Sequence, residues 1–198
     1  MTSKFVLYSV LTILLSPAWA TAATQDRAQG GDMVHVVAGV VTKLDAMSKT
    51  IVVRTADGTE EIFKYTTATT VHASEDAAKA IKTGAGDSYL AGKEGTHVIV
   101  HYTGEGSDKA AIGIDDFGQD TLKVSKGTVI RVDRAGRTFV IRGEDGAEDI
   151  YHVAEDATID SEHGIVKGAE LTAKEGANVT VHYTEKAGRK IAHLVKEI

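Results

Sequence analysis

The sequence contains no cysteine. A disulfide framework, a thiol nucleophile and a thiolate metal site are therefore all excluded. Proline and tryptophan occur once each, as Pro17 and Trp19, and both lie close to the N-terminus. The stability of the remaining chain must come from packing of its apolar residues, since 42% of all residues are hydrophobic.

Positive charge is also scarce. The chain has 22 Lys and Arg against 28 Asp and Glu, which gives a formal net charge of -6. Proteins that neutralise the phosphates of nucleic acid usually carry a surplus of Lys and Arg. Aromatic side chains, on which bases can stack, make up only 6% of the residues. We therefore expect no nucleic-acid partner.

Residues 1–22 have the features of an export signal. Lys4 supplies a positive charge before the apolar segment 5–15, and Ala18 and Ala20 fit the small-residue rule for cleavage. The apolar segment is shorter than the roughly 20 residues that span a bilayer. We expect cleavage within this segment, a periplasmic or secreted mature protein, and no membrane anchor after cleavage.

The rest of the chain contains a duplicated unit. Residues 33–71 align with residues 121–159 without gaps, and a second matching block follows in each copy. Identical pairs include Gly39 and Gly127, Asp45 and Asp133, Arg54 and Arg142, Glu60 and Glu148, and Tyr102 and Tyr183. This pattern predicts a first domain over 33–114 and a second over 121–198. We expect a flexible leader over 23–32 and a linker over 115–120.

Each unit is predicted to form short strands separated by turns, because its β-branched segments are bounded by Gly, Asp and Asn. Asp57-Gly58, repeated as Asp145-Gly146, favours a two-residue type I′ hairpin turn. Such a turn would place Arg54 opposite Glu61. Residues 98–102 alternate so that Val98, Val100 and Tyr102 share one face and His101 the other.

A short helix is predicted as an insertion in the first unit. Ser74–Lys82 has a Ser and Glu start and good helix formers, and Gly84 provides a stop. The second unit keeps only a shorter segment, Ser161–Lys167. Three strands, an irregular connection and two more strands predict an all-β fold of two tandem homologous small barrels. These barrels are OB-like, or SH3-like as the alternative.

The two copies share two sequence motifs. One is Gly-x-Val-x-x-Val/Leu-Asp, at Gly39–Asp45 and Gly127–Asp133, and the other is Val-x-Val-His-Tyr-Thr, in 98–103 and 179–184. With the order of elements, these motifs resemble exported bacterial tandem small-β-barrel domains of unknown function. The resemblance implies a fold and a compartment, and it implies no active site.

Sequence signatures of enzymes are missing. The chain has no Gly-x-Ser-x-Gly elbow and no His-Glu-x-x-His zinc helix. The glycine-rich segment 84–89 has Tyr89 where a dinucleotide loop needs its third glycine. We therefore expect neither an enzyme nor a bound cofactor.

Histidines are the remaining candidates for chemistry, and the chain has 8 of them. His101 and His182 occupy equivalent positions, while His97 lies four residues before His101 and His193 lies on the last expected strand. His97 and His101 would be roughly 13 Å apart on one strand, which is too far to share an ion. These four are the candidate metal ligands, and the other interpretation is that they lie on the solvent face.

The sequence thus favours a non-enzymatic exported binding or interaction module. Its partner would be an unidentified small ligand or an envelope protein, in an envelope or stress response. A histidine-based transition-metal binding or carrier protein is the alternative function.

Overall fold

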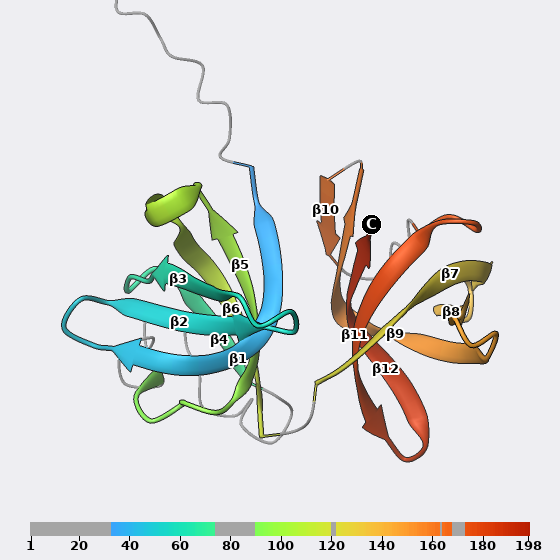
Figure 1. The fold of residues 1–198 in the computed structure, drawn as a ribbon, viewed down its shortest axis with the longest axis horizontal. Helices are drawn as coiled ribbons and strands as arrows, with labels where there is room; N and C mark the ends of the chain where they lie inside the picture. The colour runs from blue at the N-terminus through green and yellow to red at the C-terminus, as the bar shows by residue number, and fades with distance from the viewer. Residues whose placement is uncertain (1–32, 74–89, 120–121, 163, 168–172) are drawn as a thin grey trace, which may run out of the picture. The chain divides into compact units, whose positions relative to one another are not determined.

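The computed structural model describes residues 33–73, 90–119, 122–162, 164–167 and 173–198. The signal peptide, the leader and the helix expected at 74–82 lie outside these ranges. Within them the fold is all-β, and the one helical element is the short 3-10 turn Gly106–Asp108 (Figure 1). No helix in the described ranges is long and apolar enough to cross a membrane.

The first sheet, which we call barrel one, contains six strands. They are β1 (His35–Asp45), β2 (Thr50–Thr55), β3 (Glu60–Lys64), β4 (Thr70–Ala73), β5 (His97–Thr103) and β6 (Ala110–Gly118). Strands β1, β2 and β3 form an antiparallel meander, and β5 pairs antiparallel with both β1 and β6. The ring closes where β3 pairs parallel with the start of β6, and β4 pairs parallel with the same edge of β6 further along the strand.

The second sheet, barrel two, repeats this arrangement. Its strands are β7 (Lys123–Asp133), β8 (Thr138–Arg142), β9 (Glu148–Ser161), β10 (Gly164–Lys167), β11 (Asn178–Lys186) and β12 (Arg189–Glu197). Here one long strand, β9, occupies the positions that β3 and β4 occupy in barrel one. It pairs parallel with β12 along two separate stretches. Strand β10 pairs only with β9.

This strand order is that of an OB barrel. A three-stranded meander is followed by two strands, and the last of them returns to lie parallel to the third strand of the meander. That five-stranded Greek-key closure defines the OB type, so the OB-like alternative is the one that the structure adopts.

The hairpin register differs from the expected one in both barrels. Arg54 pairs with Glu60 instead of Glu61, because the loop contains three residues instead of two. The Thr55 amide donates to the Thr59 carbonyl at 2.9 Å, and Gly58 has a φ of 87°. This geometry is a turn followed by a glycine bulge, in which only the glycine needs a positive φ.

Two further boundaries differ from expectation. The segment 161–167 contains the β9–β10 hairpin, with Ser161 opposite Gly164, and not a shortened helix. Strand β6 continues to Gly118, so Asp115 and Asp116 lie inside the strand and not in a linker.

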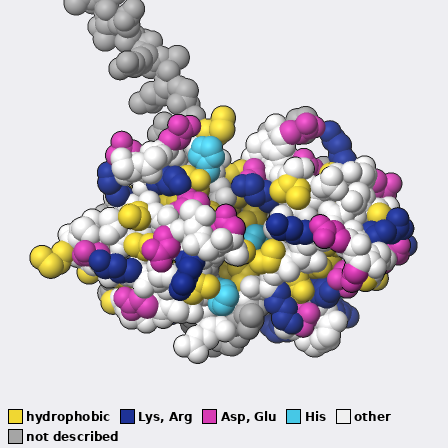
Figure 2. Space-filling view, viewed as in Figure 1, with side chains coloured by type: hydrophobic (Ala, Val, Ile, Leu, Met, Phe, Trp, Pro, Cys, Tyr) yellow, Lys and Arg dark blue, Asp and Glu magenta, His cyan; other side chains and the backbone are white. Residues whose placement is uncertain are grey.

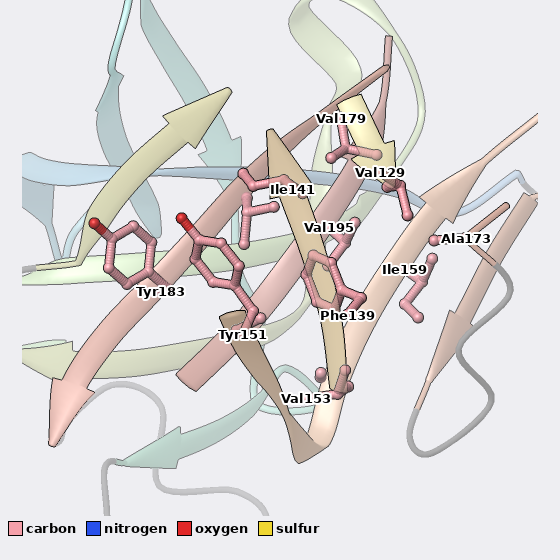
Figure 3. Packing of buried hydrophobic residues seen from close by; sticks show 13 residues of the cluster. Val129, Phe139, Ile141, Tyr151, Val153, Ile159, Ala173, Val179, Tyr183 and Val195 are labelled. Atoms are coloured by element: carbon pink, nitrogen blue, oxygen red, sulfur yellow. The ribbon is translucent and has the colours of Figure 1, made fainter. Parts of the chain in front are cut away.

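Each barrel has its own apolar core. In barrel two, Phe139 and Tyr151 stack with ring centroids 5.3 Å apart, and Tyr183 meets Tyr151 edge-on at 5.2 Å (Figure 3). The core of barrel one is formed by equivalent strands and includes Phe63 and Val100, which are fully buried. The expected inward face of β5 is thereby confirmed.

The glycine of the shared Gly-x-Val motif allows close approach of two strands. A Cβ at Gly39 would lie 2.4 Å from the Arg54 carbonyl oxygen, and a Cβ at Gly127 would lie 2.4 Å from that of Arg142. Any side chain at these positions would push the first two strands of the meander apart.

Candidate functional site

Positions that both barrels share are most simply explained by the fold. The clearest shared polar cluster contains Lys109, whose Nζ lies 2.6 Å from Glu61 Oε2. The same ammonium lies 5.7 Å from the ring centroid of Phe63 and 5.3 Å from that of Tyr102. The hydrogen bond to Glu61 raises the pKa of Lys109 above its usual value.

Barrel two contains the same cluster. Lys190 Nζ lies 2.5 Å from Asp149 Oδ2 and 5.5 Å and 5.4 Å from the ring centroids of Tyr151 and Tyr183. A lysine held between a carboxylate and two aromatic faces covers apolar surface while its charge is neutralised. Because both barrels have this arrangement of a lysine, a carboxylate and two aromatic rings, we assign it to the stability of the barrel.

A second polar cluster is present in barrel one alone. The carboxylate of Asp115, on β6, is held between two imidazoles. His101 Nε2, from β5, lies 2.9 Å from Asp115 Oδ2, and His72 Nδ1, from β4, lies 3.0 Å from Oδ1. The side-chain exposures are 3% for His101, 17% for Asp115 and 59% for His72, so the cluster reaches from the interior to the surface.

The burial of His101 overturns the expectation that it faces solvent. It lies, as expected, on the face of β5 opposite Val100, but this outer face is itself apolar and buried. Ile99 on the same face is 1% exposed, and Val36 and Ala38, which pair with this part of β5, are 4% and 5% exposed. The polar character assumed for this face was therefore wrong.

One nitrogen of His101 has no partner. Its Nε2 must carry a proton in order to donate to the Asp115 carboxylate. Nδ1 is buried and makes no hydrogen bond within the described part of the chain.

A hollow lies next to this imidazole. Gly113 on β6 pairs with His101 on one side and with Thr70 on the other. Val34, Thr70, Ile112, Gly113 and, from β10, Ile165 line the hollow together with His101. Ile112 is 42% exposed and Val34 is 37% exposed, so the hollow is accessible from solvent.

The equivalent position explains why barrel two differs here. Leu194 pairs with His182 just as Gly113 pairs with His101, and Leu194 is 1% exposed. Where barrel two places a leucine side chain, barrel one has only a hydrogen.

The charged partners have also changed between the copies. Lys196 stands at the position of Asp115 and Asp160 at that of His72, and their side chains form an ion pair at 3.4 Å. Burial, and then the charge of Lys196, lower the pKa of His182 to about 4. Barrel two thus keeps a neutral imidazole beside a fixed ion pair.

The four histidines singled out in the sequence do not meet at one site. His97 and His101 lie on the same strand, and His97 pairs with Gly118. His193 makes a hydrogen bond of 2.9 Å with Thr184 Oγ1, and burial lowers its pKa. In the described ranges, no group of three His, Asp or Glu side chains is placed to hold a metal ion.

Sequence reasoning missed His72 and Asp115 as members of a cluster. His72 was one of the histidines not singled out as a candidate ligand, and Asp115 was placed in a linker. A signal was nevertheless present, because the pair His72 and Asp115 is replaced in the second copy by the charge-complementary pair Asp160 and Lys196.

The charged residues form no single-sign patch on the face shown in Figure 2. Acidic and basic side chains alternate over it.

The fold and this cluster define an OB-type tandem β-barrel protein with a buried, carboxylate-held histidine in one barrel. No family model matches the chain. No curated protein matches it either. Among solved structures, a crystal structure of Ag(I)CusF has a TM-score of 0.28 and 22% sequence identity, and the match covers 43% of this chain and 99% of that chain. The OB assignment made above depends on the strand pairing alone.

Proposed function

We propose that the chain is an exported, non-enzymatic binding protein and that barrel one binds its ligand at His101. The observation that carries this proposal is the buried Nδ1 of His101, which has no hydrogen-bond partner in the described ranges. An unsatisfied buried polar group costs about 1–3 kcal/mol. A bound ligand that forms a hydrogen bond with this nitrogen would remove that cost.

The difference between the barrels supports the same site. Gly113 lines the hollow beside His101, whereas Leu194 stands at the equivalent position of barrel two. A glycine at this position leaves room for a bound molecule next to the His101 ring.

We assign no enzymatic role to His101 because of the groups that surround its imidazole ring. A general base acts on a nucleophile or substrate within hydrogen-bond reach. The free nitrogen of His101 has no hydroxyl partner within the described residues. Export is proposed from the signal-like pattern of residues 1–22.

Transition-metal binding is the second candidate. One observation favours it, because metal-bound histidines commonly donate their other ring N–H to a carboxylate, as His101 does to Asp115. Zinc sites need three or four ligands, however, and no such group exists in the described ranges. A metal ion bound at His101 would need most of its ligands from outside the described residues. Transition-metal binding is therefore the second candidate function.

The test is native mass spectrometry of the exported protein purified from its own cell envelope. Three forms are compared: the wild type, Gly113→Leu to fill the hollow, and Ile62→Ser as a control at an exposed position of barrel one. We expect a non-covalent adduct on the wild type and the control and none on Gly113→Leu. An adduct-free wild type, or an adduct that survives Gly113→Leu, would overturn the proposal.

A further inference from the structure

We propose that the outer face of β1 and β5 in barrel one is a docking surface for barrel two of the same chain, and that the docked barrels move as one rigid body. The observation that carries this proposal is a third apolar cluster, which lies outside the cores of the two barrels and contains buried residues of both. The proposal does not depend on a ligand at His101.

Three members of the third cluster lie on the outer face of barrel one. Val36 and Ala38 belong to β1 and Ile99 belongs to β5, and their exposed fractions are 4%, 5% and 1%. Val98 and Val100, on either side of Ile99, belong to the core of barrel one, so Ile99 points out of the barrel. An outward side chain that is almost fully buried must be covered by another part of the chain.

Barrel two supplies the cover. Leu122, which precedes β7, and Leu194, on β12, complete the cluster and are 6% and 1% exposed. Ile165, on β10, packs against it. Next to the cluster, the ring centroids of Phe117 on β6 and His193 on β12 lie 4.7 Å apart. The contact between the barrels therefore has the apolar and aromatic character of a stable protein interface.

The equivalent face of barrel two is polar. Lys126 pairs with Thr180 at the position where Ala38 pairs with Ile99 in barrel one. Lys126 is exposed and Thr180 is only partly buried. Burial of an unpaired ammonium is costly, so this face is unsuited to docking. The composition of each face thus matches whether it is covered, being apolar in barrel one and polar in barrel two.

The connection between the barrels is held at both ends. Only residues 119–122 separate the end of β6 from the start of β7. Phe117, just before this connection, packs against the third cluster, and Leu122, at its end, is a member of it. Domains joined by a linker move relative to each other unless a hydrophobic interface prevents it. Here the interface begins directly at the connection, which favours one rigid body.

The test measures how the two barrels tumble in the processed protein, using amide ¹⁵N relaxation to obtain a rotational correlation time for each barrel. We expect one shared value in the wild type. The double variant Ala38→Lys/Ile99→Thr gives barrel one the residues of barrel two. In it we expect two values that fall toward about half the wild-type value, because each tumbling body then has about half the mass.

Two further variants complete the test. Lys126→Ala makes the reverse exchange at the equivalent, exposed position of barrel two and should tumble as the wild type does. Leu194→Glu places a charge in the interface from the side of barrel two and should separate the barrels. Leu194 lies outside the core of barrel two, and barrel one has Gly113 at the equivalent position, so we expect the fold of this variant to persist.

Independent tumbling of the two barrels in the wild type would overturn the proposal. A shared correlation time in either folded interface variant would do the same, because the docked face would then not be what holds the barrels together. If the double variant fails to fold, the wild type and Leu194→Glu still decide between the two outcomes.

Discussion

At the scale of single residues, His101 and His182 are the same residue of the repeat in two different surroundings. His101 is paired with a carboxylate, and His182 lies near the ammonium of Lys196. The strand, the register and the residue type are identical, so any difference in behaviour between the two histidines must come from their partners. This makes each histidine the natural control for the other.

The first prediction concerns pH. The pKa of His182 is about 4 in the folded protein and 6.5 in its reference state. Between these values the unfolded chain binds the proton more tightly, so His182 lowers stability progressively as the pH falls from about 6.5 to about 4. The full effect is up to about 3 kcal/mol.

Urea denaturation of wild type and His182→Gln from pH 7 to pH 4.5 measures this effect. We expect the substitution to flatten the loss of stability over that window, because glutamine does not titrate. Parallel pH profiles for the two proteins would show that His182 is solvated.

The second prediction concerns the buried carboxylate. His101→Phe keeps the ring volume but removes the hydrogen bond that Asp115 receives from His101. We expect a loss of about 2–4 kcal/mol in the free energy of unfolding, since removing one partner leaves a mostly buried charge under-compensated. His182→Phe removes no hydrogen bond to a carboxylate and should cost less than half as much in the same thermal or urea melt. Equal losses would contradict a structural role for the His101–Asp115 pair.

At the scale of elements, the close approach of the first two strands defines each barrel. The third prediction is that Gly39→Ala destabilises the protein by about 2 kcal/mol or more, because its Cβ would lie 2.4 Å from the Arg54 carbonyl oxygen. Gly113→Ala is the matched control on β6, where the nearest atom is a side-chain oxygen at 3.3 Å. Differential scanning calorimetry should show a clearly lower Tm for Gly39→Ala than for Gly113→Ala, and the reverse order would refute this assignment.

The elements also show how far the sequence could predict the structure. The repeat and the alternation of residues 98–102 indicated two small barrels correctly, because these signals are local. Asp57-Gly58 is compatible with a two-residue turn and with a three-residue turn and bulge, so the register remained open to a shift by one residue. The choice depends on the flanking hydrogen bonds, which sequence does not show.

The candidate site was less predictable for a physical reason. His72 and Asp115 meet only because β4 pairs parallel with β6, and strand pairing between distant segments has no local signature. The burial of His101 likewise depends on Val36 and Ala38, which belong to a different strand. Only comparison of the two copies position by position could have indicated the cluster.

At the scale of the whole molecule, the two main cores are formed separately. The core that contains Phe63 and Val100 draws only on residues of barrel one, and the core that contains Tyr151 and Val181 draws only on residues of barrel two. The domain division proposed from the repeat therefore leads to a fourth prediction. The fragment 121–198 should fold alone, with β-type circular dichroism and a cooperative melt.

Amide spectra of the fragment and of the full chain test this autonomy. We expect the dispersed signals of residues 121–198 in the full chain to recur in the fragment with few changes. A collapsed, poorly dispersed spectrum would show that the second repeat needs the first in order to fold.

The central claim is that the hollow beside His101 holds a ligand in the native protein. Its most direct test is a crystal structure of the protein isolated from its own envelope without denaturation. We predict non-protein density against Gly113, with one polar atom within about 3 Å of His101 Nδ1. A hollow that contains only a water molecule bonded to Nδ1, or none at all, would contradict the account.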